Sequence, residues 1–199
     1  MDLDGAPFEL SVMQSIGLAP KITRATLSLP DTLQRPRDRL RDARHAFTSL
    51  RELHLSVLSR DDALNTGVAQ ELGQWQTARV LSLKTMASCE GVTEMLRALQ
   101  QMTQLVELNV NVQAPAEYDE DEVQMQLGVS RMLPNHAALR RVELTIDRTY
   151  RFEHTEEYAI AMRSLIEKTR SILDHRFQGK LQFTSRSTHD YICFSSVQL

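Results

Sequence analysis

Histidine and cysteine are the side chains that most often bind metals or act as nucleophiles, and in this chain they are scattered. No two histidines have the i, i+4 spacing that would place two zinc ligands on one helix face. The two cysteines, Cys89 and Cys193, are far apart, so we expect neither a zinc site nor a disulfide framework. A chain of this kind fits a reducing compartment, and we predict a cytoplasmic or nuclear location. The six histidines are His45, His54, His136, His154, His175 and His189.

The sequence shows no local motif of a known enzyme class. It contains no Gly-x-Ser-x-Gly elbow, no phosphate-binding loop and no His-Glu-x-x-His motif. We therefore predict that the chain is not an enzyme and binds no cofactor. The alternative is a small hydrolase or transferase whose site the fold assembles from distant residues, in a deep apolar pocket that holds His54 or Cys89.

Two charged stretches could bind ions, and each also has a simpler interpretation. The first carries five arginines, but three interleaved aspartates reduce its balance to +2, which is typical of an exposed, salt-bridged helix face. The second, Glu117–Glu122, lacks the ordered ligand positions and the glycine of a calcium loop, and it reads as a solvated loop that leads into a helix. The first stretch comprises Arg35, Arg37, Arg39, Arg41 and Arg44 with Asp31, Asp38 and Asp42.

The best candidate for a binding surface is a set of polar residues that alternate with leucine and valine. Such alternation is typical of a strand with one buried face, so the polar residues of successive strands should share the other face. We predict that this face binds another protein; the alternatives are a solvated face without a partner, the helices or the acidic loop. The predicted protein-binding residues are Glu52, His54, Ser82, Lys84, Asn109, Asn111, Arg141 and Glu143.

Five segments with a common leucine spacing must position these residues. Measured at the third apolar position of each segment, the first three intervals are nearly equal, and the fourth is longer because it contains the acidic stretch. A unit that recurs in this way indicates an array in which each unit buries its apolar face against the next. The segments start at Arg24, Leu50, Ala78, Leu105 and Leu139, and the positions measured are Leu29, Leu55, Leu83, Val110 and Leu144.

Helical patterns separate the strands. Apolar residues recur at three- and four-residue spacings over 64–72, 92–102, 123–133 and 156–175. Strand and helix in regular succession predict parallel strands joined by right-handed crossovers. After the last helix, residues 180–183 and 191–197 read as two further strands that form a hairpin, and residues 8–16 read as a short helix that covers the first strand.

The segments resemble leucine-rich repeats of the longer α/β type found in ribonuclease-inhibitor-like proteins. The likeness rests on Leu50-x-x-Leu53-x-Leu55 and its counterparts over residues 22–147, although Thr32 alone matches the polar turn position of that family. Residues 18–27 are also similar to the entry into the first repeat of fungal F-box proteins with such repeats. This resemblance implies a solenoid with parallel strands on its concave face and helices on its convex face. It also implies non-catalytic protein recognition, including substrate selection for a ubiquitin ligase.

These observations combine into one prediction for the whole chain. We expect a single repeat domain over residues 1–199, with a cap at 1–20, about five strand–helix repeats at 21–150, and a long helix with two strands at 151–199. The net charge of -3 and pI near 6.1 argue against nucleic acid or membrane as a partner, and no apolar run reaches membrane-spanning length. A further alternative is self-association through the apolar strand Tyr191–Phe194.

Overall fold

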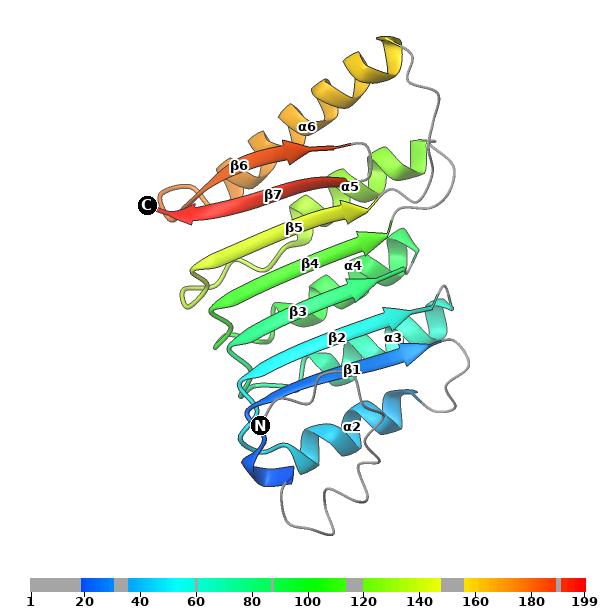
Figure 1. Ribbon diagram of the computed structural model, residues 1–199, viewed down its shortest axis with the longest axis vertical. Coiled ribbons are helices and arrows are strands. Elements are labelled where there is room, and N and C mark those ends of the chain that lie inside the picture. Colours follow the sequence, from blue (N-terminus) through cyan, green and yellow to red (C-terminus); the bar gives the residue numbers. More distant parts are fainter. Residues whose placement is uncertain are drawn as a thin grey trace.

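The chain forms an α/β structure around one seven-stranded sheet in the computed structural model (Figure 1). The structure describes residues 19–30, 36–59, 61–86, 88–113, 120–147, 156–188 and 191–199. The strands are β1 (Arg24–Pro30), β2 (Glu52–Leu58), β3 (Val80–Thr85), β4 (Glu107–Gln113), β5 (Arg141–Asp147), β6 (Leu181–Ser187) and β7 (Tyr191–Gln198). The helices are η1 (Ala19–Lys21), α2 (Pro36–Ala46), α3 (Asp62–Leu72), α4 (Cys89–Leu99), α5 (Glu120–Met132) and α6 (Glu156–Arg176).

The first five strands lie side by side in chain order and run parallel to one another. Each strand is followed by a helix and then by its neighbouring strand, as the alternation of patterns predicts. The helices α3, α4 and α5 lie behind the sheet in Figure 1, and α2 and α6 lie at its two ends. No described helix covers the opposite face. The expectation of an α/β fold with parallel strands in chain order is confirmed for this part of the sheet.

The sheet buries one face of each strand against the helices. Leu53, Leu55 and Val57 of β2 are at most 1% exposed, while the alternate residues of that strand are half-buried. The leucines and valines of β3, β4 and β5 repeat this pattern, and α4 adds an apolar stripe that includes Met95 and Leu96. One continuous apolar core therefore fixes which residues of every strand point away from the helices.

The first segment has a different register from the one that the leucine spacing suggested. Leu27, and not Leu29, pairs with Leu55, while Ala25 takes the position of Leu53. Counted from Leu27, the first interval has the same length as the interval from Leu55 to Leu83. A shift of two positions leaves every side chain on the same face, so the apolar alternation cannot detect it.

The carboxyl-terminal end of the sheet contradicts the predicted solenoid. The strands β6 and β7 form the expected hairpin, but β7 inserts between β5 and β6 and runs antiparallel to both. A hairpin turn short enough for the backbone N–H of Thr188 to bond the carbonyl of Tyr191 must reverse the chain, so the second strand returns in the opposite direction. The architecture is therefore a mixed, mostly parallel seven-stranded sheet.

Two predicted features lie outside the described residues. The short helix predicted over residues 8–16 is one, and the first part of the acidic stretch, residues 117–119, is the other. The remainder of that stretch, residues 120–122, is the start of α5, so the helix begins three residues earlier than the predicted loop allowed. Within the described part of the chain, no helix is both long and apolar enough to cross a membrane.

Candidate functional site

The eight residues predicted to bind a protein lie together on the sheet face that no described helix covers. The strand register arranges them in three rows across the sheet, because parallel neighbours pair without an offset. The first row holds Glu52, Glu107 and Arg141, of which Glu107 is an additional member; the second holds His54, Ser82, Asn109 and Glu143; the third holds Lys84 and Asn111. The structure thus brings the predicted set together on one face of the sheet.

The charged residues of this open face mostly neutralise one another. Glu52 contacts the Arg24 guanidinium at 2.7 Å and the His54 ring at 2.9 Å. Arg141 lies 4.0 Å from Glu107 and 3.9 Å from Glu143. The open face therefore carries little unbalanced charge with which to attract a charged ligand.

The pKa of Glu52 reflects this pairing. Burial acts to raise the pKa of its carboxyl group, but hydrogen bonds and charge attraction from Arg24 and His54 outweigh burial and hold the pKa below its ordinary value. Glu52 is thus an ionised partner in a local ion network. The network stabilises the arrangement of β1 and β2, and an ionised Glu52 has no proton to donate as a general acid at neutral pH.

A second surface, at the amino-terminal ends of the parallel strands, was not predicted. It contains Arg51, Arg79, Arg140 and Lys180, which we call the basic edge. The carbonyl of Arg51 accepts a hydrogen bond from the N–H of Arg79 at 2.7 Å, and the carbonyl of Arg79 accepts one from Val106 at 2.7 Å. The carbonyl of Val106 in turn accepts one from Arg140 at 2.7 Å. This backbone ladder aligns one residue per strand, and each step is about 4.8 Å.

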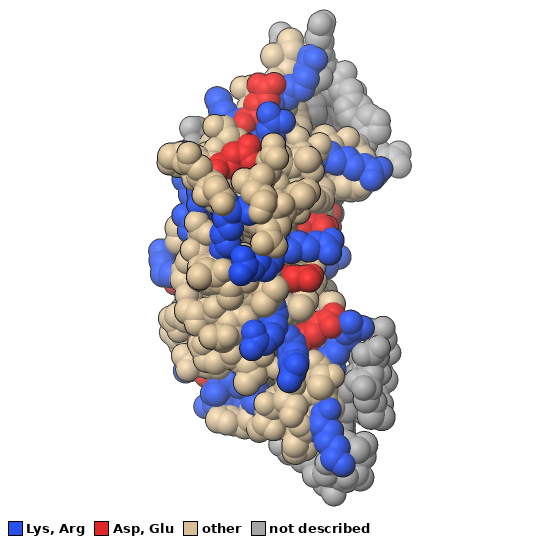
Figure 2. Space-filling model, turned by 90° about the vertical axis from the view of Figure 1, so that its left-hand side faces the viewer, with Lys and Arg blue, Asp and Glu red and all other residues tan. Residues whose placement is uncertain are grey.

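Figure 2 looks onto this edge and shows Lys and Arg side chains along its length. Arg51, Arg79 and Arg140 are exposed, and none of them forms an ion pair with a carboxylate in the described part of the chain. This distinguishes them from Arg24 and Arg141, which begin β1 and β5 and have acidic partners. The edge therefore holds unbalanced positive charge in a chain whose net charge is -3.

Positive charges crowd one another where the basic edge reaches β6. The Lys180 ammonium group donates a hydrogen bond to the backbone carbonyl of His136. Burial, together with the nearby charge of Arg140, lowers the pKa of Lys180. Burial and the charge of Lys180 likewise lower the pKa of His136, whose two ring nitrogens are buried without a described hydrogen-bond partner. An anion at this point would relieve the repulsion.

The helix macrodipoles account for some basic residues on this side, but not for the basic edge. The described helices direct their carboxyl ends here, and cations in the last turn of a helix offset its negative end. Arg97, Arg131 and His175 occupy such positions. By contrast, the three arginines of the basic edge follow α2, α3 and α5 beyond the last turn, where that effect no longer acts.

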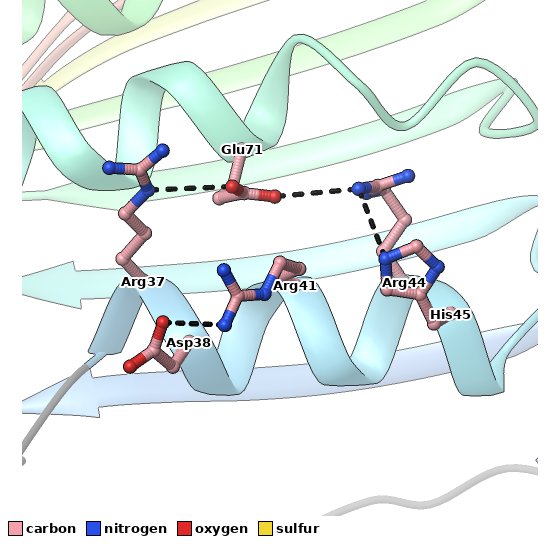
Figure 3. Close-up of polar contacts among 6 residues, drawn as sticks. All are labelled: Arg37, Asp38, Arg41, Arg44, His45 and Glu71. Atoms are coloured by element: carbon pink, nitrogen blue, oxygen red, sulfur yellow. Dashed lines mark hydrogen bonds and ion pairs between the residues drawn. The ribbon is translucent and has the colours of Figure 1, made fainter.

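The arginines of α2 have a structural role, but only Arg41 pairs with an interleaved aspartate as predicted, and Arg35 and Asp31 of the predicted cluster lie outside the described residues. Figure 3 shows Arg37 and Arg44 directed toward Glu71 of α3, which is 6% exposed. The Arg37 Nε atom lies 3.4 Å from one carboxylate oxygen, and the Arg44 guanidinium lies 3.6 Å from the other, an ion-pair contact rather than a hydrogen bond. Arg41 pairs with Asp38 at 2.8 Å on the exposed face. These arginines therefore either join α2 to α3 or pair within α2.

The strand predicted for self-association lies inside the sheet. Residues Tyr191–Phe194 belong to β7, which pairs with β5 on one side and with β6 on the other. The strand at this end of the described sheet is β6, whose outward residues are polar.

Cys193 is a free cysteine, and its sulfur lies 3.5 Å from the Ser195 hydroxyl. The described residues contain no group of three or more His, Cys, Asp or Glu side chains that could hold a metal ion.

Comparison with known proteins gives no family for this chain. No family model matches it, and no curated protein matches it. Among solved structures, it is similar to a mutant of the 16S rRNA (adenine(1408)-N(1))-methyltransferase from Catenulisporales acidiphilia, with 11% identity over 98% of this chain and 93% of that chain. The TM-score of 0.32 is too low for this likeness to assign an activity or a substrate to the chain.

These findings correct the predictions that depended on the leucine-rich-repeat resemblance. The family assignment is wrong: β7 lies antiparallel between β5 and β6, unlike the strands of a parallel solenoid, and no family model matches the chain. The F-box kinship, the ubiquitin-pathway role and the non-catalytic recognition function fall with it. The prediction that the chain is not an enzyme is contradicted as well and is not kept: the solved structure reported above is that of a methyltransferase mutant, at a TM-score that assigns no activity to this chain. The physical cause of the error is that leucine spacing reports strand burial, which many α/β proteins share.

The basic edge was missed although the sequence carries a trace of it. An arginine follows the first apolar residue in three of the five segments, as Leu50-Arg51, Ala78-Arg79 and Leu139-Arg140. That position precedes the alternating part of each strand, so the alternation within a segment does not predict which face or edge of the sheet the arginine occupies. Comparison of equivalent positions across the segments, instead of neighbours within each segment, identifies the column.

Proposed function

We propose that this chain binds an acidic segment of another protein along the basic edge. The observation that supports the proposal is the column of Arg51, Arg79 and Arg140, which are exposed and unpaired among the described residues. Maintaining like charges in register costs repulsion, and a carboxylate-rich ligand would remove that cost. Binding here is compatible with either a catalytic or a non-catalytic chain.

The dimensions of the edge suit a short extended peptide. From Arg51, just before β2, to Lys180, just before β6, there are five strand-to-strand steps, or about 24 Å at roughly 4.8 Å per step. A peptide that crosses the strand ends in extended form would span this with about seven residues. Flexible arginine side chains can then adjust to carboxylates on that segment.

Single-stranded nucleic acid is a poorer match to the same edge. Proteins that bind it usually add aromatic platforms on which bases stack. The aromatic residues of three helix-to-strand connections, Phe47, Trp75 and Phe177, are at most 4% exposed. They belong to the core and offer no stacking surface. We therefore retain the expectation of a protein partner, with neither nucleic acid nor membrane.

A peptide-binding measurement tests the proposal. A fluorescent deca-glutamate peptide should bind the full chain, with an affinity that falls as salt is added. The variant Arg51→Gln/Arg79→Gln/Arg140→Gln should bind about tenfold more weakly, because three exposed ion pairs contribute roughly 0.5 kcal/mol each. The matched control is Arg39→Gln/Lys168→Gln/Arg170→Gln, which removes three exposed charges elsewhere and should bind like the wild type.

Two results would contradict the proposal. Equal loss of binding in both triple variants would show attraction to net charge alone. Tighter binding of a single-stranded or duplex oligonucleotide than of the peptide, lost in the Arg51/Arg79/Arg140 variant, would assign the edge to nucleic acid instead.

Two untested predictions accompany this proposal. The eight residues of the open face stay predicted protein contacts, since they adjoin the basic edge through Arg141. We also infer a cytoplasmic or nuclear location, supported by Cys193 as a free thiol and by the distance in sequence between the two cysteines.

A further inference from the structure

A groove lies where α4, α5 and α6 end. Its volume is about 660 Å³, which falls within the usual size of small-molecule sites. It contains three basic side chains and no carboxylate among its lining residues. These residues are Gln100, Arg131, Asn135, Ser171, Ile172, His175 and Arg176.

Side-chain hydrogen bonds to helix ends build the floor of this groove. The Gln100 amide donates to the carbonyl of Met132 at 2.9 Å, and the Asn135 amide donates to the carbonyl of Arg176. Arg176 donates from Nε to the carbonyl of Leu133 at 2.6 Å. The ends of α4, α5 and α6 are thereby fixed relative to one another, which favours a preformed site.

The same contacts leave cationic donors unused. The carbonyls of Met132 and Leu133 at the end of α5 and of Arg176 at the end of α6 are already bonded, two of them by neutral amides. Arg131 and the terminal nitrogens of Arg176 have no carboxylate partner in the described part of the chain. Burial also lowers the pKa of Arg176, as expected for a guanidinium group that is partly removed from water.

We propose that this groove binds an organic phosphate monoester, with the phosphate between the guanidinium groups of Arg131 and Arg176. Guanidinium groups bind phosphate through two parallel hydrogen bonds, and a phosphate dianion balances two such cations. The amide oxygens of Asn135 and Gln100 remain free to accept hydrogen bonds from hydroxyl groups. That combination fits a polyhydroxylated organic group of the size of a sugar phosphate.

Calorimetric titration of the full chain with glucose 6-phosphate, inorganic phosphate and glucose tests this site. Glucose 6-phosphate should bind saturably and at least tenfold more tightly than inorganic phosphate, and glucose should not bind. Arg131→Gln should weaken binding at least tenfold. The matched control is Arg170→Gln, which removes an exposed charge from α6 outside the groove and should bind like the wild type.

A second measurement places the ligand, and it separates this inference from the basic edge. On addition of glucose 6-phosphate, NMR signals of the amides of Arg131, Asn135 and His175 should shift. The Arg51/Arg79/Arg140 variant should bind it normally, so loss of peptide binding and loss of phosphate binding are independent outcomes. The proposal is wrong if neither phosphate binds saturably in the millimolar range. Equal affinity for both phosphates, or equal loss in the Arg131 and Arg170 variants, would also overturn it.

Discussion

The arginines of α2 and those of the basic edge are chemically identical, but their surroundings give them opposite roles. In α2, Arg37 and Arg44 share the nearly buried Glu71 of the next helix, and Arg41 pairs with Asp38. At the basic edge, Arg51, Arg79 and Arg140 stand in a column without acidic partners among the described residues. The first group supports packing between helices, and the second is available to a ligand.

The difference teaches that local charge density is a poor guide to ligand binding. In sequence the α2 cluster is the denser one, with its arginines at every second or third position, whereas Arg51 and Arg79 are separated by a whole helix and strand. Parallel strands in chain order bring Arg51 and Arg79 within one strand step, about 5 Å of backbone spacing, and Arg140 follows two steps beyond Arg79. In the α2 cluster, helical spacing instead places acidic partners beside the arginines. Arg41 pairs with Asp38 three residues before it, and Arg44 pairs with Glu71 of α3.

The largest effect that tests this comparison is expected at Glu71. Glu71→Gln removes the shared partner of Arg37 and Arg44 and should lower the free energy of unfolding by about 1–2 kcal/mol, because a nearly buried charge contact is lost and polar groups are left unpaired. Partial exposure of both arginines keeps the effect below that of a fully buried pair. Urea unfolding followed by circular dichroism measures it.

The control for Glu71 lies on the exposed side of α2. Asp38→Asn removes an ion pair with Arg41 in which both side chains are well exposed, so its cost should stay within about 0.5 kcal/mol. If Glu71→Gln and Asp38→Asn lower the free energy of unfolding equally, the Glu71 contact contributes no more to stability than an exposed ion pair. The arginines of α2 would then not stabilise the packing of α2 against α3.

A smaller effect is expected from neutralising the basic edge. Arg51→Gln/Arg79→Gln/Arg140→Gln should leave the free energy of unfolding unchanged within about 0.5 kcal/mol, or raise it slightly, because no ion pair is broken and like charges are removed. Thermal unfolding in low salt measures the change. A clear loss of stability, comparable to that of Glu71→Gln, would show that these arginines stabilise the fold, and the contrast with α2 would disappear.

The elements of this fold were more predictable from the sequence than its site. Leu53, Leu55 and the polar residues between them identified β2 and its buried face, because alternation depends on neighbours in one strand. The insertion of β7 between β5 and β6 was not predictable in this way, since antiparallel and parallel pairing leave the same alternation. Predicting the basic edge requires the alignment of residues between different strands. The sequence pattern fixes that alignment weakly, since it aligned Leu29 with Leu55 where the structure pairs Leu27 with Leu55.

The smallest expected effect concerns pH at the crowded end of the basic edge. The pKa of His136 is lowered in the folded protein, so as pH falls through the ordinary histidine value of 6.5 the unfolded chain takes up a proton before the folded one does. Stability should therefore decrease from pH 7 toward pH 5, until the pH passes below the lowered pKa. His136→Asn should flatten this decrease, and Arg140→Gln should leave it largely intact because burial and Lys180 are the causes of the His136 shift.

Urea unfolding at pH 7, 6 and 5 measures the slope, and a slope unchanged by His136→Asn would show that other groups control it. In that case the burial of His136 and its repulsion by Lys180 would contribute nothing measurable to the stability of the folded state. The contrast between the paired arginines of α2 and the unpaired arginines of the basic edge would then be supported only by the peptide-binding measurement.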